Sequence, residues 1–207
     1  MIYSITSSID ATLYEEFETK NSGLDEVLQL VKIISSSKTN DTYNSRILTK
    51  FDLTHISKSI NSGDIKDTFV STLKLYTHRA EQLPYQYSLK VYAASQSWEM
   101  GIGRDDHNPK TTEGVSWKYR DGDSTGTEWH TSSVAIPFAT GTTGSLSTQT
   151  TPGGGTWWTG SDISQTFTYE ASDLSVDVTS IVRPWLSGSW DGGPVLDNEG
   201  FLIKRTD

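Results

Sequence analysis

The residue types best suited to acid–base or metal chemistry stand together in the segment RDDHNP, residues 104–109. Two aspartates beside a histidine could serve a hydrolase as acid and base, or could bind a metal ion. Neighbours in sequence on a loop rarely converge on one point, however. The other histidines, His55, His78 and His130, are scattered along the chain. We therefore interpret this segment as a charged loop exposed to solvent.

The segment DGDSTGTE, residues 121–128, begins like a calcium-binding loop. Asp121 and Asp123 occupy the first and third places of such a loop. The twelfth place, where a bidentate glutamate would stand, holds Ser132. Calcium would therefore need another ligand, such as Glu128, and we favour an acidic turn over a metal site.

A catalytic carboxylate could stand at Glu99 in SQSWEMG. Glycosidases need a pair of carboxylates, and no partner for Glu99 stands at a recognisable spacing. The sequence also contains no Ser-His-Asp pattern, no glycine-rich phosphate loop and no HExxH motif. We predict that the protein is not an enzyme and uses no cofactor.

The segment GGGTWW, residues 153–158, combines three glycines with paired indoles. Exposed tryptophans can stack on sugar rings or anchor a protein interface. On a strand, Trp157 and Trp158 point to opposite faces, so at least one should leave its own core unless the segment is irregular. We favour an interface role over glycan stacking for Trp129, Trp157 and Trp158; the remaining alternative is that they are core residues.

The elements that would position these side chains are β-strands. Apolar and polar residues alternate with period two in seven segments, as expected for antiparallel sheets with one buried face. These segments are 45–53, 68–79, 87–93, 114–120, 165–171, 174–178 and 200–205. Their number and spacing predict an all-β fold, an antiparallel β-sandwich or barrel. Residues 23–34 fit either a helix or a strand, and the β-branched run at their end favours a strand.

The strand predicted at 174–178 is followed by apolar residues at helical spacing, ending in Trp185. We expect one short helical turn there that closes the open end of the core. Thr179 or Ser180 should cap its start, and Pro184 should prevent its continuation. The residues predicted to form the core or frame of the sandwich are Phe51, Leu73, Leu75, Trp98, Trp185 and Phe201.

Between the predicted strands lies a long excursion, residues 101–164, rich in glycine, threonine and tryptophan. A loop of this length in a compact domain is usually functional or disordered, and its tryptophans argue against disorder. We expect it to pack either on its own sandwich or on a neighbouring subunit. The whole chain, 1–207, is interpreted as one domain carrying this insertion.

Five segments in order resemble the DNRLRE-type β-sandwich, a jelly-roll domain related to carbohydrate-binding modules. They are DATL followed by NSG and VLQL, then SRILTKFDLTHI, then TLKLYTHR, then YSLKVYAASQSWEMG with GVSW, and finally VDVTSIVRPWLSG with NEGFLIK. The resemblance covers residues 10–117 and 174–204, and residues 118–173 match nothing in that family. It implies a jelly roll in which Trp98 and Glu99 are framework residues.

A second resemblance spans nearly the whole chain. The start MIYSITSSIDATLYEE, the strand SRILTKFDL and the segments SQSWEMGIGR, TTEGVSWKYRDG and GGGTWWTG are similar to virion structural proteins of tailed bacteriophages, notably those of cyanobacteria and marine bacteria. This resemblance implies a place among the head-surface, neck or tail components of a virion.

The composition and charge of the chain exclude several classes of binding partner and site. The formal net charge is −9, which disfavours contact with nucleic acid or an anionic membrane surface. There is no cysteine, so neither a disulfide framework nor a thiolate metal site is expected. No apolar run approaches the roughly 20 residues of a membrane span, and MIYSITSSIDATLYEEF does not read as a secretory signal.

We therefore expect a virion protein made in the host cytoplasm, present in many copies as a homo-oligomer and bound to other capsid, neck or tail proteins. The alternative is a carbohydrate-binding adhesin domain that contacts host surface glycans.

Overall fold

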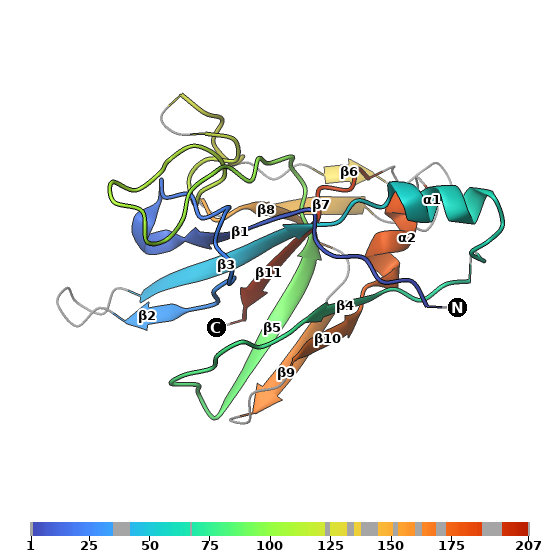
Figure 1. Cartoon of the computed structure of the whole chain (residues 1–207), viewed down its shortest axis with the longest axis horizontal. Helices are drawn as coiled ribbons and strands as arrows, with labels where there is room; N and C mark the ends of the chain where they lie inside the picture. The colour runs from blue at the N-terminus through green and yellow to red at the C-terminus, as the bar shows by residue number, and fades with distance from the viewer. Residues whose placement is uncertain are drawn as a thin grey trace.

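The structure is a computed structural model, and it describes residues 2–34, 42–66, 68–122, 125–131, 135–137, 145–150, 153–159, 163–168, 173–187 and 196–206 (Figure 1). Its elements, in chain order, are β1 (Ile9–Tyr14), η1 (Glu15–Phe17), β2 (Lys32–Ile34), β3 (Thr42–Lys50), α1 (Thr54–Asn61), β4 (Thr72–Leu75), β5 (Gln86–Ala93), β6 (Ala135–Pro137), β7 (Ser145–Thr150), β8 (Thr156–Thr159), β9 (Ile163–Thr168), β10 (Leu174–Asp177), α2 (Thr179–Ser187) and β11 (Phe201–Arg205).

These strands form three antiparallel sheets. The main sheet has the order β1-β3-β11-β5-β9, and β2 pairs with the first residues of β3. A second sheet consists of β10 and β4, and a third of β6, β7 and β8. The antiparallel sheets of the predicted all-β fold are thus confirmed, although the structure is mostly β and includes two short helices, α1 and α2. The two ends of the described chain meet in one sheet, because β11 pairs directly with β3, which also pairs with β1.

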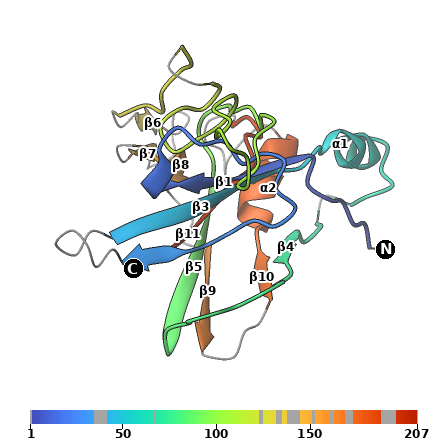
Figure 2. The same ribbon diagram turned by 60° about the vertical axis from the view of Figure 1, so that its left-hand side comes forward.

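The main sheet is buried on both faces. On β11, Phe201 and Ile203 point to one face and belong to a cluster that we call the first core, whereas Leu202 between them points to the other face and belongs to the second core. All three side chains are at most 3% exposed. Figures 1 and 2 place β4 and β10 on one side of this sheet and the loops that follow β5 on the other. The molecule therefore has a central sheet between two covering layers.

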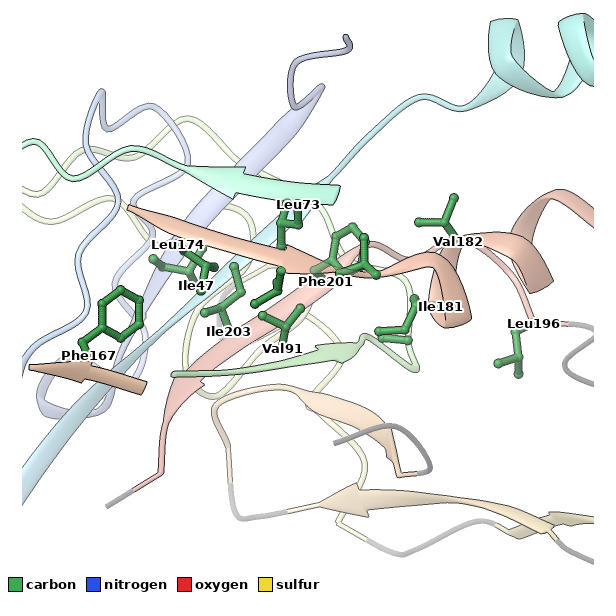
Figure 3. Close-up of a cluster of buried hydrophobic side chains, with 13 residues drawn as sticks. Ile47, Leu73, Val91, Phe167, Leu174, Ile181, Val182, Leu196, Phe201 and Ile203 are labelled. Atoms are coloured by element: carbon green, nitrogen blue, oxygen red, sulfur yellow. The ribbon is translucent and has the colours of Figure 1, made fainter. Parts of the chain in front are cut away.

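The first core is closed by β4, β10 and the C-terminal helix α2 (Figure 3). Ile181 and Val182 of α2 are buried in it, and the Trp185 ring lies 5.0 Å from the Phe201 ring. The expected apolar turn after the strand is present, but two of its details are corrected. The Asp177 carboxylate, rather than Thr179 or Ser180, accepts the first exposed N–H, that of Thr179, at 2.8 Å.

The second correction is that α2 continues past Pro184 to Ser187. A proline inside a helix removes one backbone hydrogen bond and strains the preceding turn. Here the residues on both sides of Pro184 are anchored, because Val182 and Trp185 pack on the first core. This packing offsets the missing bond, so the helix runs on for three residues.

The open side between β9 and β10 is closed by the side chain of Gln165. Its Oε1 accepts the N–H of Ser175 at 2.7 Å, and its Nε2 donates to the carbonyl of Asp173 at 3.0 Å. An amide side chain on β9 thus takes the place of a neighbouring strand along β10. The main sheet and the β4–β10 sheet are thereby joined along this side.

One predicted strand, 114–120, is absent. Val115, Trp117 and Tyr119 are buried as the alternation required, but the backbone crosses the second core without pairing, apart from an isolated bridge between Tyr119 and Glu128. Its N–H groups bond instead to scattered carbonyls, for example Val115 to Glu99 and Lys118 to Glu18. The period-two pattern in this segment therefore indicates alternating burial of side chains, and it does not indicate pairing with a neighbouring strand.

The strand favoured for 23–34 forms only at Lys32–Ile34. Before it, side-chain hydroxyls stand in for a partner strand: Thr12 accepts the N–H of Gln29 at 3.0 Å, and Ser45 accepts that of Val31 at 2.8 Å. The helix α1, which follows β3, was not expected at all. Its start is stabilised by Asp52, whose carboxylate accepts the N–H of Thr54 at 2.9 Å.

The residues predicted for the core lie in one of the two cores. Leu73, Trp98 and Phe201 are at most 5% exposed. The other three are partly buried and pack against the first core: Phe51, Leu75 and Trp185.

The two-sided core leads to a stability prediction. Leu202→Ala and Ile203→Ala should each lower the free energy of unfolding by about 2–5 kcal/mol, because each removes a buried side chain from a different core. The exposed Ser164→Ala, on β9, should stay within about 0.5 kcal/mol of the unchanged protein. Urea unfolding followed by tryptophan fluorescence measures all three. A loss below about 1 kcal/mol for Leu202→Ala alone would show that the second face is not a core.

Candidate functional site

The two neighbouring tryptophans on β8 are both covered by their own chain. Trp157 pairs with Ala94 at the end of β5, is 5% exposed and belongs to the second core. Trp158 points to the opposite face and packs, partly buried, against the first core. They do point to opposite faces, as a strand requires, but neither leaves the interior because both faces are covered. The prediction that Trp157 offers a surface for a partner or a sugar is therefore wrong for the described structure.

The same correction applies to Trp129. It is 2% exposed, and its indole N–H donates to the carbonyl of Ser116 at 3.0 Å. Trp98 is fixed in the same way, since its indole N–H donates to the carbonyl of Glu199 at 2.9 Å. A buried indole whose N–H is satisfied internally is a stable core residue. The described part of the 101–164 excursion thus packs on its own main sheet, the first of the two alternatives stated above.

Arg46 holds the excursion to the sheet. Its guanidinium lies 4.7 Å from the centre of the Trp117 ring and 5.2 Å from that of Trp157, and it donates to the carbonyl of Gly154 at 2.7 Å. Cation–π contacts of this kind strengthen when water is excluded. Burial lowers the pKa of Arg46 to about 10, with the Glu15 carboxylate opposing the change, so the side chain stays charged at neutral pH. Arg46 therefore joins β3 to two separate segments of the excursion.

The three glycines before Trp157 are required by this contact. Gly153, Gly154 and Gly155 all have φ between +75° and +86°, a region that other residues rarely adopt. A Cβ on Gly154 would lie 2.6 Å from Arg46 Nη1, and one on Gly155 would lie 2.6 Å from Leu202. The run GGG thus allows the backbone to lie directly on Arg46 and the second core.

A second anchor of the excursion is the buried side chain of Asn21. Its Nδ2 donates to the carbonyls of Met100 and Val115, each at 2.7 Å, and its Oδ1 accepts the N–H groups of Gly103 at 2.7 Å and Gly23 at 3.2 Å. All four hydrogen-bonding positions of the amide are occupied. One side chain thus fixes both ends of the loop between 100 and 115.

The Asn-x-Gly segment that leads into β11 uses the same arrangement. Asn198 accepts the N–H of Gly200 at 3.1 Å and donates to the carbonyl of Phe51 at 2.9 Å. The asparagines of the two Asn-x-Gly segments, Asn21 and Asn198, therefore have a structural role: their side-chain amides hold separate backbone segments together.

Beyond the second core, the same face of the main sheet carries a row of cations, which we call the cation row. Lys204 on β11 lies between two other cations. It pairs with Lys90 on β5 on one side. On its other side lies Arg46 of β3, because the register pairs Ile203 with Ile47 and the next position pairs Lys204 with Arg46. Burial lowers the pKa of Lys204, and Arg46 and Lys90 lower it further. Like charges on adjacent strands repel, so this row would attract carboxylate, sulfate or phosphate groups.

A pocket of about 190 Å³ lies beside η1, between β1, β2 and β3. Lys20 lines it, is 2% exposed, forms an ion pair with Asp105 and lies 4.1 Å from the centre of the Tyr14 ring. Burial lowers the pKa of Lys20, and Lys110 lowers it further. Burial also raises the pKa of Tyr14 to about 12. The ammonium is held by its own chain, so we interpret Lys20 as an anchor for the loop that carries Asp105.

The acidic residues singled out in the sequence are used in a similar way. The Asp121 carboxylate accepts the N–H of Thr127 at 2.6 Å, and this bond lowers its pKa. Glu128 forms an ion pair with Lys118 at 3.3 Å, and Asp123 lies outside the described residues. In the RDDHNP segment, His107 Nδ1 bonds to the hydroxyl of Thr111 at 3.0 Å. Within the described ranges no three acidic or histidine side chains gather as metal ligands.

Sequence reasoning missed the side chains that are actually at the surface. Residues Ile2–Thr6 lie outside any helix or strand; we call them the arm, and the Ile2 side chain is 93% exposed. Val70 and Tyr76, on either side of β4, are 71% and 78% exposed. Large apolar residues of this exposure are candidates for contact with another chain. The available signal was the alternation of apolar Tyr3 and Ile5 with polar Ser4 and Thr6, next to the apolar Ile2.

Comparisons with protein-family models, with curated proteins and with solved structures each return no match for this chain. Among the helices that the structure describes, none has the length and apolar character needed to cross a membrane.

The close contact at Gly154 gives a prediction with an internal control. Gly63 has a similar positive φ, +82°, but a Cβ there would meet nothing within 4 Å. Gly63→Ala should therefore cost only the backbone strain, about 1–2 kcal/mol, whereas Gly154→Ala should cost about 1–3 kcal/mol more because it also displaces Arg46. Equal losses in urea unfolding would contradict the proposed contact between the glycine run and Arg46.

Proposed function

We propose that this chain is a non-enzymatic structural subunit of a tailed-bacteriophage virion, which docks on the head surface, neck or tail as an accessory or fibre-associated protein. The resemblance of its segments to such virion proteins supports this function. The observation that carries it structurally is the placement of large apolar side chains on the outside, on the arm and beside β4, while the aromatic rings of the excursion lie inside. Large apolar side chains of this exposure fit contact with other proteins.

We further propose that the fold is a jelly roll of the DNRLRE type and that the chain is a single domain. Packing of the β4–β10 sheet against the main sheet supports the jelly-roll assignment, as does the closing order β10, α2, β11. The presence of β1 and β11 in one sheet supports the single domain.

The non-enzymatic assignment is supported by what three of the candidate acidic residues do. Asp105 pairs with Lys20, Glu128 pairs with Lys118, and Asp121 accepts a backbone N–H. Each of these carboxylates stabilises a loop of the excursion. A general acid or base would instead need a free carboxyl group facing a substrate.

The alternative function, a carbohydrate-binding adhesin domain, has one observation in its favour. The cation row lies beside the hydroxyls of Ser88 and Thr166, which are 2.9 Å apart on the same face. Cations and hydroxyls on a sheet face suit an acidic glycan better than a neutral one. Binding to an array of acidic glycans by the purified protein, abolished in Lys204→Glu, would favour this alternative over docking.

The particle itself tests the virion assignment. An antibody raised against the purified chain should label gradient-purified phage particles at one fixed place, in a number that matches the symmetry of that component. Labelling by immunogold electron microscopy should persist after a high-salt wash, because an apolar contact is not weakened by salt. Absence of the chain from washed particles, with the protein present only in the soluble lysate, would refute the proposal.

A further inference from the structure

Some edge strands have their outer N–H and C=O groups hydrogen-bonded by side chains, whereas β4 does not. This difference suggests a contact between copies at β4. An edge strand exposes unpaired N–H and C=O groups, which can pair with another chain unless they are covered. On β1 the outer groups of Thr12 are covered by Ser22, whose hydroxyl accepts its N–H at 3.0 Å and donates to its carbonyl at 2.7 Å. On β10 the corresponding groups are covered by Gln165.

The outer edge of β4 has no such cover. The N–H of Ser175 points away from β4 toward Gln165, so its cross-strand partner Lys74 turns its own N–H and C=O away from β10. Thr72, two residues earlier, does the same, and among the described residues no group bonds to these outer positions. The strand therefore presents two N–H and two C=O groups for pairing.

The arm has the length and pattern of a strand that could fill this edge. Its five residues would extend about 17 Å at roughly 3.3 Å per residue, slightly more than the four-residue β4. Tyr3 and Ile5 would lie on one face of such a strand, and they are 47% and 43% exposed. On β4 the apolar face carries Leu73 and the half-buried Leu75. Tyr3 and Ile5 could extend that face and cover Leu75.

Among the described residues, the arm also makes no backbone hydrogen bond. The first backbone bond near it joins the N–H of Ser8 to the carbonyl of Lys50 at 2.8 Å. In Figure 1 the N-terminal end lies on the side of the molecule where α1 and the start of β4 lie. A segment with three exposed apolar side chains, Ile2, Tyr3 and Ile5, and an uncovered edge strand thus occur on the same side of one chain.

We propose that the arm of one copy, Ile2–Thr6, pairs with β4 of a second copy as an added strand. Reciprocal exchange would give a two-fold dimer, and head-to-tail exchange would give a ring. This deepens the proposed function by naming the contact between copies. Its test uses purified protein, so its failure and the absence of the chain from particles are separate results.

The first experiment measures self-association by sedimentation velocity across a range of concentrations. Lys74→Pro removes an N–H that points outward and should leave the β4–β10 pairing intact, since proline is tolerated where the N–H faces solvent. Lys74→Pro and the double variant Tyr3→Ser/Ile5→Ser should each weaken association by about tenfold or more. Ile34→Ser, on β2, removes an equally large side chain that is 68% exposed and should leave association unchanged.

The second experiment identifies the partners directly. The chain has no cysteine, so Ser4→Cys in one copy and Thr72→Cys in a second, larger tagged copy can be mixed and treated with a short bismaleimide. A covalent product between the two copies is expected, and neither variant alone should give one. A protein that is monomeric at every concentration, arm and β4 variants that associate like the unchanged chain, or a mixture without cross-linked product would each overturn the proposal.

Discussion

The central strands of the main sheet carry apolar side chains on both faces, and neither face can be left to water. Along β11 the sequence Phe-Leu-Ile places Leu202 opposite in direction to its neighbours, and β3 repeats the arrangement with Ile47 and Leu48. Burying each such side chain stabilises the fold by about 1.5–3 kcal/mol relative to its exposure. The chain meets this requirement with two separate covering layers, β4, β10 and α2 on one face and the excursion on the other.

This constraint explains which aromatic and polar side chains are used inside the fold and which remain near the surface. Trp117, Trp129 and Trp157 of the excursion fill the second core, so these rings are unavailable as a platform for sugars or partners. Trp158 packs, partly buried, against the first core. Arg46 and Asn21 donate hydrogen bonds to backbone carbonyls of that layer and so hold it on the sheet. The ion pair between Lys20 and Asp105 holds a neighbouring loop. Among the described residues, those placed at the periphery for contact with other molecules include the arm, the edge of β4, and Lys90 and Lys204 of the cation row.

The sequence alone predicted the strands well where the alternation was regular, as in β3, β5 and β11, because a pleated strand with at least one buried face imposes that period. It could not distinguish a strand from a non-paired segment crossing a core, which is why 114–120 was assigned wrongly. It also could not reveal that side chains such as Thr12, Ser45 and Gln165 replace strand partners, since these bonds join residues far apart in the chain.

The wrong prediction for Trp157 has one physical cause. The prediction assumed a sandwich with one dry face per sheet, and in that arrangement one of two adjacent indoles must face solvent. The clue was present in β11, where Phe201, Leu202 and Ile203 are consecutive apolar residues and leave no polar side chain for a wet face at this point. The need for glycine at position 154 could be seen only in the structure, where Arg46 lies against its backbone.

The central claim, that the excursion is an integral layer of the core, is tested most directly by native-state hydrogen exchange. The N–H groups of Val115 and Gly154, which bond to Glu99 and Trp117, belong to the excursion, and those of β11 belong to the main sheet. If the two form one cooperative unit, Val115 and Gly154 should exchange only with the same free energy as β11, that of global unfolding. Exchange at these two positions at a much lower free energy, with β11 still protected, would mean that the excursion is a detachable loop and would contradict the account.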